Sequence, residues 1–257
     1  MKNNRVGIIG SGNMAFSLGK ELLYAGFTIT EVYSRNKREG KKLSVLLKAD
    51  YVPDPAGLKG NADLYLICLQ DDAIGAIIKQ LPVEDKIVVH TSGAVPMNVF
   101  KGYANKYGVL YPVQSINKNV DANWKEIPLC IEANDSATKK QLTGIAKKIS
   151  QKIFHIDSEQ RKHLHVAAVF ANNFSNACFT MAKELLDESH LSFDLMRPLI
   201  LHTATKIQTN NPLKVQTGPA IRNDVKVLKE HRKLLKDHPE LKKVYEVMTN
   251  FIQHTPQ

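Results

Sequence analysis

Cysteine is scarce in this chain of 257 residues, and its three cysteines, Cys68, Cys130 and Cys178, stand far apart. No two of them form a C-x-x-C pair, which excludes a disulfide scaffold and the common cysteine-based metal and redox motifs. An odd number of thiols in apolar surroundings predicts reduced, buried cysteines in a cytoplasmic protein. We expect no metal site.

Long apolar runs are also missing. No stretch approaches the roughly 18 residues that a membrane helix needs. Residues 1–5 lead directly into a strand-like segment, without the apolar core of a signal peptide. Internal repeats and low-complexity segments are absent as well, and the composition is neither collagen-like nor typical of disorder. We therefore expect a globular protein of the cytoplasm with no membrane partner.

Acidic residues are outnumbered, with 25 Asp and Glu against 35 Lys and Arg, a net charge of +10. Such an excess suits nucleic acid, an acidic membrane surface or a small anionic ligand. Much of it lies in residues 226–243, where basic side chains alternate with Glu and Asp. Mixed signs at helical spacing are typical of a solvated face, so we expect no nucleic-acid partner.

The first half of the chain alternates short β-branched apolar runs with helical or loop segments. The candidate strands are residues 5–9, 28–33, 63–69, 86–91, 108–111, 128–132 and 152–156. Most are apolar on both faces, as in strands buried between helices. A candidate helix over residues 14–25 separates the first two strands and completes a βαβ unit. The pattern predicts an α/β domain over residues 1–157, with a Rossmann-like, doubly wound, mostly parallel sheet.

Helical periodicity dominates after residue 157. The predicted helical stretches are 158–188, 192–209 and 225–253, with Ser158 as a candidate N-cap of the first. Pro198 marks either a kink or a start of the second stretch. We predict an all-helical domain over residues 158–257.

A G-x-G-x-x-A motif occupies residues 10–15, between the first strand and the first helix. Gly10 permits a tight turn, and Gly12 removes a side chain where a pyrophosphate approaches the backbone. The helix N-terminus adds free N–H groups and a positive dipole. In this position the motif favours a dinucleotide-binding turn over an ordinary glycine turn. The predicted cofactor contacts here are Gly10, Ser11, Gly12, Asn13 and Met14.

The segment after the second strand distinguishes between cofactors. A site for NAD carries Asp or Glu here to accept the ribose hydroxyls, but Ser34 is followed by Arg35, Lys37 and Arg38. A hydroxyl and three cations suit the 2′-phosphate of NADP(H), although a solvated basic loop is the alternative. Glu31 lies earlier, within the strand. We expect Ser34 and Arg35 to contact NADP(H), together with Leu69 and Gln70 at the end of the third strand.

The predicted helix over residues 158–188 carries a line of polar side chains. At about 100° per residue, four of them fall within about 60° of one another. They are Arg161, His165, Asn172 and Asn176. The rest of the helix is largely apolar, so a buried polar line needs hydrogen-bond partners, which a ligand would supply. The alternative is that the line faces solvent or another subunit.

These residues suggest roles in a reaction. His165 is the candidate proton donor or acceptor because imidazole exchanges a proton near neutral pH. Asn172 joins it as a catalytic candidate, while Asn176 would orient a substrate and Arg161 would bind its carboxylate. Ser92, after the fourth strand, is a third catalytic candidate as a hydrogen-bond donor, or it only completes a turn.

A turn at residues 217–224 leads into the last helical region. Thr217 and Arg222 are candidate substrate-binding residues that would close a cleft over an anionic substrate. The alternative is that Arg222 pairs with Asp224 at the start of the helix.

Several of these segments resemble known families. Residues 7–15 resemble the N-terminal domain of pyrroline-5-carboxylate reductases and deazaflavin-dependent NADP oxidoreductases, and the helical second half resembles the 6-phosphogluconate-dehydrogenase-like superfamily. Residues 90–94, 165–174 and 217–224 resemble a bacterial family in which a Rossmann-like domain precedes a C-terminal domain of unknown function. This resemblance spans nearly the whole chain. It implies NADP-linked oxidoreduction and a homodimer formed through the helical domain.

The chain departs from that family at two positions. The family often has histidine where this chain has Tyr111, so a role for that imidazole does not transfer. It tends to have glycine where this chain has Asn223. Because asparagine tolerates a left-handed backbone, we expect the turn to survive.

We therefore expect an NADP-dependent oxidoreductase that transfers a hydride between NADP(H) and a small polar substrate bound between the two domains. The alternative is a module that binds NADPH as a sensor or regulator without turnover.

Overall fold

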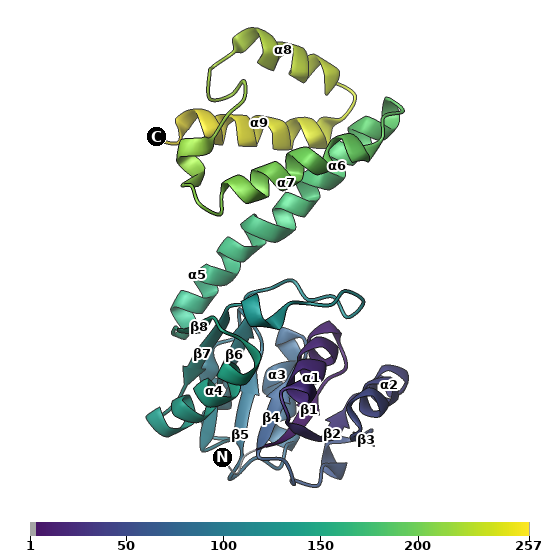
Figure 1. Ribbon diagram of the computed structural model, residues 1–257, viewed down its shortest axis with the longest axis vertical. Coiled ribbons are helices and arrows are strands. Elements are labelled where there is room, and N and C mark those ends of the chain that lie inside the picture. Colours follow the sequence, from purple (N-terminus) through teal and green to yellow (C-terminus); the bar gives the residue numbers. More distant parts are fainter. Residues whose placement is uncertain (1–3, 257) are drawn as a thin grey trace. The chain divides into compact units, whose positions relative to one another are not determined.

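The computed structural model describes residues 4–256 (Figure 1). The chain divides into two compact units, one ending at Asn173 and the other beginning at Phe174. The predicted boundary after residue 157 falls between the last strand and the long helix that follows it. The first compact unit continues into that helix.

In the described residues, eight strands form one sheet with the order β3-β2-β1-β4-β5-β6-β7-β8. The strands are β1 (Arg5–Ile9), β2 (Thr28–Tyr33), β3 (Asp50–Val52), β4 (Leu64–Ile67), β5 (Ile87–His90), β6 (Lys106–Pro112), β7 (Leu129–Ala133) and β8 (Ile153–His155). Neighbouring strands are parallel except β6 and β7, which are antiparallel. This confirms the Rossmann-like, mostly parallel sheet.

The sequence pattern missed strand β3. It has three residues and pairs with the end of β2, where Glu31 lies opposite Asp50. So short a segment at the sheet edge shows no apolar run, and its backbone pairing alone makes it a strand.

Helices cover both faces of the sheet, as a doubly wound fold requires. They are α1 (Asn13–Tyr24), α2 (Lys37–Leu47), α3 (Asp71–Ile77) and α4 (Ser136–Ile149), with 3₁₀ turns at Pro55–Gly57, Ile78–Gln80, Met97–Phe100 and Trp124–Glu126. Apolar side chains of α1, α2 and α4 share one buried cluster with the sheet, while α3 contributes Ile74 and Ile77 to a second. Because β1, β4, β5 and β6 are parallel, the loops after them meet at one edge.

A long helical segment begins after β8 and continues into the second unit (Figure 1). It consists of α5 (Ser158–Ala168), a π-helical segment η5 (Val169–Phe174) and α6 (Ser175–Glu188). The N-cap of α5 is Asp157 rather than the predicted Ser158. Asp157 accepts a hydrogen bond from the Gln160 N–H, and the Gln160 side chain bonds back to the Asp157 N–H.

The described part of the second unit is helical throughout, as predicted. After α6 come α7 (Arg197–Lys206), α8 (Val225–Leu234) and α9 (Pro239–His254), with 3₁₀ turns at Phe193–Leu195 and Pro212–Val215. Pro198 lies in the first turn of α7 and starts this helix without kinking it. The single predicted stretch over residues 225–253 is two helices, since proline at position 239 cannot extend the preceding one.

The cysteines only partly follow the prediction. Cys68 and Cys130 are buried, and burial raises the pKa of Cys68 to about 12 and that of Cys130 to about 11. Cys178 is exposed, against expectation, and none of the residues of the α6 helix that carries it is buried. None of the helices described over residues 4–256 has the length and apolar character required to traverse a bilayer.

Candidate functional site

A cavity of about 490 Å³ lies at the carboxyl ends of β1, β2 and β4. Its walls are Gly10, Ser11, Gly12, Ser34, Arg35, Asn36, Cys68, Leu69, Gln70 and Ala73. Every predicted cofactor residue except Asn13 and Met14 is among them. Asn13 opens α1, and Met14 packs against the core.

The two motif glycines have different structural roles. Gly10 has a φ of 117°, and a Cβ there would overlap the carbonyl group of Cys68, so the turn itself needs glycine. Gly12 is the N-cap of α1, and a Cβ there would meet nothing within 4 Å. No side chain caps α1, so its first N–H groups remain available to an anion. The site therefore fits a pyrophosphate against Gly12.

The polar groups beside this turn fit a 2′-phosphate. Ser34 and Ser11 share a hydrogen bond of 2.7 Å between their hydroxyls, and Arg35 is exposed on the cavity wall. Glu31, in contrast, is 1% exposed and accepts hydrogen bonds from the Tyr65 hydroxyl (2.6 Å) and the Lys59 N–H (3.0 Å). Because the Glu31 carboxylate is already bonded inside the protein, it cannot serve as the acidic ribose ligand of an NAD site.

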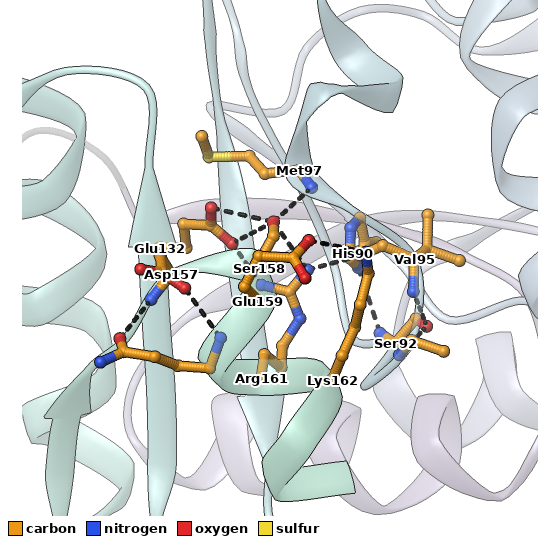
Figure 2. A network of polar contacts seen from close by, with 12 residues as sticks. His90, Ser92, Val95, Met97, Glu132, Asp157, Ser158, Glu159, Arg161 and Lys162 are labelled. Carbon is orange, nitrogen blue, oxygen red and sulfur yellow. Dashed lines mark hydrogen bonds and ion pairs between the residues drawn. The ribbon is translucent and has the colours of Figure 1, made fainter. Parts of the chain in front are cut away.

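A separate cluster of polar side chains surrounds Arg161 and connects α5 to the sheet (Figure 2). The Arg161 side chain is 1% exposed, forms an ion pair with Glu132 of β7 and donates to the carbonyl oxygen of Val95. The Ser158 hydroxyl donates to Glu132 at 2.8 Å and accepts from the Met97 N–H at 3.0 Å.

This geometry does not fit the predicted substrate-carboxylate role of Arg161. Its guanidinium already neutralises a carboxylate of the protein and has almost no surface left for a ligand. Arg161 instead links the start of α5 to β7 through Glu132, and to the loop after β5 through the carbonyl oxygen of Val95. The sequence pattern could not show this, because Glu132 lies on a distant strand.

The predicted polar line along the helix is interrupted after His165. Residues Val169–Phe174 form a π-helix, whose wider turn breaks the regular α-helical spacing of side chains. Asn172 lies within this segment and is exposed, and Asn176 lies beyond it. Asn172 therefore does not share a continuous α-helical face with Arg161 and His165.

The remaining predicted substrate residues lie in the second unit. Thr217 and Arg222 are exposed, and Asp224 caps α8 by accepting from the Val227 N–H at 3.2 Å. Asn223 has a φ of 51°, so the left-handed turn survives there as expected. Also in this unit, ligand atoms of Glu184, Glu188 and His238 lie within 4.8 Å of one another. His238 contacts Glu188 at 3.0 Å, and Glu184 lies one helical turn before Glu188 on α6, which accounts for that proximity.

The loop after β5 brings Ser92 and Gly93 to the sheet edge. The Ser92 hydroxyl oxygen accepts hydrogen bonds from the N–H groups of Ala94 (3.1 Å) and Val95 (3.0 Å). Ser92 therefore does complete a turn, and its own hydroxyl proton remains for another acceptor. Beside it, the hydroxyl of Tyr111 lies 3.2 Å from Nδ1 of His165. In the sequence Tyr111 stands out only as a departure from a family pattern, and no local signal indicates this contact.

His90, at the end of β5, is a structural residue. Its ring is fully buried, packs on Phe100 at 5.4 Å between centroids, and accepts at Nδ1 from the Ser92 N–H at 3.2 Å. Burial, with a contribution from the positive charge of Arg161, lowers the pKa of His90 to about 3. A neutral, enclosed imidazole supports the loop that carries Ser92.

Two family models match the chain. Residues 5–93 match the family described as NADP oxidoreductase, coenzyme F420-dependent, and residues 127–252 match a domain of unknown function, DUF2520. No curated protein matches this chain.

Solved structures extend the comparison to the full chain. A candidate NADP oxidoreductase from Bacteroides fragilis is 39% identical with a TM-score of 0.92, covering 98% of this chain and 99% of that one. A Thermotoga maritima protein is 22% identical over 96% of each chain, with a TM-score of 0.74. An imine reductase from Myxococcus stipitatus, solved with NADP+, is 14% identical with a TM-score of 0.70, covering 97% and 93%. The last two show a common fold.

Proposed function

Because this chain belongs to the family in which an NADP oxidoreductase domain precedes a DUF2520 domain, we propose that it transfers a hydride between NADP(H) and the C=O or C=N group of a small polar substrate. It is an NADP-dependent oxidoreductase by family. The reacting group and the residues that act on it are the proposed part. When bound, NADPH supplies the hydride, and the protein supplies binding, orientation and a proton.

The observation that carries this proposal is the cavity at the carboxyl ends of β1, β2 and β4. Its open Gly12, the uncapped N-terminus of α1 and the exposed Arg35 together suit a dinucleotide with an additional phosphate. In open α/β sheets, ligands bind outside the carboxyl ends of the strands, and the loop with Ser92 lies at this same edge.

We assign His165 as the group that exchanges a proton with the substrate and Ser92 as a hydrogen-bond donor to it. The Ser92 oxygen accepts two backbone N–H groups, which orient its hydroxyl. Asn172 is kept as a catalytic candidate, and Asn176, Thr217 and Arg222 as substrate-binding candidates. Their exposure leaves them accessible to a ligand.

The first test is turnover. We expect a panel of ketones, cyclic imines and hydroxyacids to contain compounds that change NADPH or NADP+ absorbance in the presence of the protein. His165→Ala should reduce that rate by about 100-fold or more, the usual contribution of a positioned acid or base, with unchanged NADPH affinity. His163→Ala, two residues away on the exposed side of α5, is the matched control. If NADPH binds and no compound reacts, the non-catalytic sensor is the better description.

The second test concerns the cofactor phosphate. Arg35→Ala should weaken NADPH binding by about 10- to 100-fold, the equivalent of one charge-assisted hydrogen bond, and leave NADH binding nearly unchanged. Arg38→Ala is the control, because Arg38 is equally exposed but does not line the cavity. Isothermal titration of both nucleotides measures the effect. Tighter binding of NADH than of NADPH by the wild-type protein would contradict the role of Arg35.

We also propose that the chain forms a homodimer through its helical part. Helix α9 exposes Val244, Val247, Met248 and Phe251 at helical spacing, with Val247 67% and Phe251 66% exposed. A contiguous apolar stripe of this kind is typical of a surface that another protein covers.

A further inference from the structure

Tyr111 and His165 meet at the carboxyl edge of the sheet, from two different elements. Tyr111 is next to last in β6, and His165 is on α5. The Tyr111 hydroxyl lies 3.2 Å from Nδ1 of His165, and the two rings meet edge to face at 6.2 Å and 75°. Tyr111 is only 8% exposed, whereas His165 is half-buried.

Gly93 lies close to the imidazole of His165 and to the ring of Tyr111. A Cβ at this position would lie 2.6 Å from Nδ1 of His165 and 3.0 Å from Cζ of Tyr111. Any larger residue would therefore push the two rings apart. The absence of a side chain at Gly93 thus leaves the room in which His165 bonds to Tyr111.

The direction of this hydrogen bond follows from burial. A buried phenol needs an acceptor for its proton, and Nδ1 is the acceptor that the described residues provide. Burial raises the pKa of Tyr111, so its hydroxyl keeps that proton at neutral pH. An Nδ1 that accepts a hydrogen bond is unprotonated, so the neutral ring carries its proton on Nε2. Among the bonds formed within residues 4–256, that of the His165 ring is made at Nδ1, and Nε2 is left for a ligand.

We propose that Tyr111 is a positioning residue that holds His165 as its Nε2–H tautomer, so that this N–H is the group offered to the heteroatom of the substrate. The role of this N–H toward a substrate rests on the proposed function. The hydrogen bond and the tautomer themselves do not depend on turnover.

The proton transfer balances through this pair. As the substrate carbon gains the hydride, its oxygen or nitrogen takes the proton of Nε2. The Tyr111 hydroxyl proton passes to Nδ1 at the same time, which keeps the imidazole neutral. The pair is then restored when Nε2 takes a proton from water, leaving hydroxide, and the phenolate takes back the proton of Nδ1. The positive charge of Arg161 favours the phenolate, since it acts to lower the pKa of Tyr111 against the larger effect of burial.

Nitrogen-15 NMR of the imidazole rings tests the tautomer directly, on the whole protein without substrate. At about pH 8, where imidazoles are ordinarily neutral, His165 should show an unprotonated Nδ1 and a protonated Nε2. His163, on the same helix, is an internal reference with the opposite state, because its Nδ1 lies 2.9 Å from the carbonyl oxygen of Glu159 and must donate to it.

Two variants should remove the hydrogen bond that fixes the tautomer of His165. Tyr111→Phe removes the hydroxyl, and Gly93→Ala keeps it but displaces His165. Each should raise the Nδ1–H fraction of His165 by about five-fold, the equivalent of one ordinary hydrogen bond, while the His163 signals stay in place. Tyr107→Phe, on the same strand, is the control for losing a phenol hydroxyl. A protonated Nδ1 in the wild-type protein, or ring shifts unchanged by Tyr111→Phe, would overturn the proposal.

Kinetics then separate this proposal from the proposed function. With any ketone or imine that oxidises NADPH, Tyr111→Phe should lower kcat by about 10-fold or more, as expected for an impaired proton donor, with unchanged NADPH affinity. An unchanged kcat would also overturn the positioning role. If no compound is turned over, the proposed function fails, and the NMR result still decides whether Tyr111 sets the tautomer.

Discussion

Replacing Gly12 by valine is expected to abolish NADPH binding while leaving the fold intact. A Cβ at position 12 meets nothing within 4 Å, and the backbone there is extended, with a φ of −80°, so the protein itself has room for a side chain. The new side chain would occupy the space into which the N–H groups of α1 project. Hydrogen bonds from backbone N–H groups to a phosphate contribute roughly 1.5–3 kcal/mol each, so losing two weakens binding by about 100-fold or more.

Gly12→Val should therefore lose NADPH affinity while it keeps most of its stability. Valine is a poorer N-cap than glycine and costs at most about 1 kcal/mol in the free energy of unfolding, which urea denaturation measures. Gly75→Ala in α3 is the matched control, because its Cβ would make only an ordinary contact with Val99 at 3.5 Å. Gly10 cannot be used in this way, since any side chain there overlaps Cys68. Retention of NADPH affinity within about three-fold would place the pyrophosphate elsewhere.

Replacing Arg161 by methionine is expected to lower the free energy of unfolding by about 3–5 kcal/mol, because it leaves the carboxylate of Glu132 in a largely enclosed site without its cation. Only Ser158 among the side chains described in residues 4–256 would then still donate to that carboxylate. Urea denaturation followed by circular dichroism measures the loss. The double variant Arg161→Met/Glu132→Leu should recover much of it, because no charge is then left buried.

Lys162 provides the comparison for Arg161. It is the next residue on α5, and its ion pair with Glu159 is exposed, so Lys162→Met should change stability by less than about 1 kcal/mol. An Arg161→Met variant as stable as Lys162→Met would restore the alternative that Arg161 is a ligand-binding residue.

The glycine turn between β1 and α1 was predictable because it is local. The strand, the two glycines and the helix start follow one another within residues 5–15, and each residue acts through its own backbone. The NADP(H) cofactor was predicted from local residues as well, since Ser34 and Arg35 directly follow β2. Even here the sequence did not reveal that Glu31 is enclosed with Tyr65, a residue of another strand.

The roles of the polar residues on the long helix were harder to predict, because they depend on what each side chain contacts. Arg161 looked like a ligand residue on a helix face, but its partner is Glu132, 29 positions away in the sequence. His165 stands out in the sequence as a polar residue of the same helix, but its contact with Tyr111 spans 54 positions. The π-helical segment after Ala168 changed the direction of Asn172, and no periodicity computed at a constant angle includes such a turn.

The sequence by itself determined the α/β and helical halves, the glycine turn between the first strand and the first helix, and the basic residues after the second strand. These follow from hydrophobic period and from residues adjacent in the chain. Only the tertiary structure decided which polar side chains are already satisfied and which remain for a ligand. That distinction depends on burial and on partners brought together from different strands, and neither is encoded in the spacing along one element.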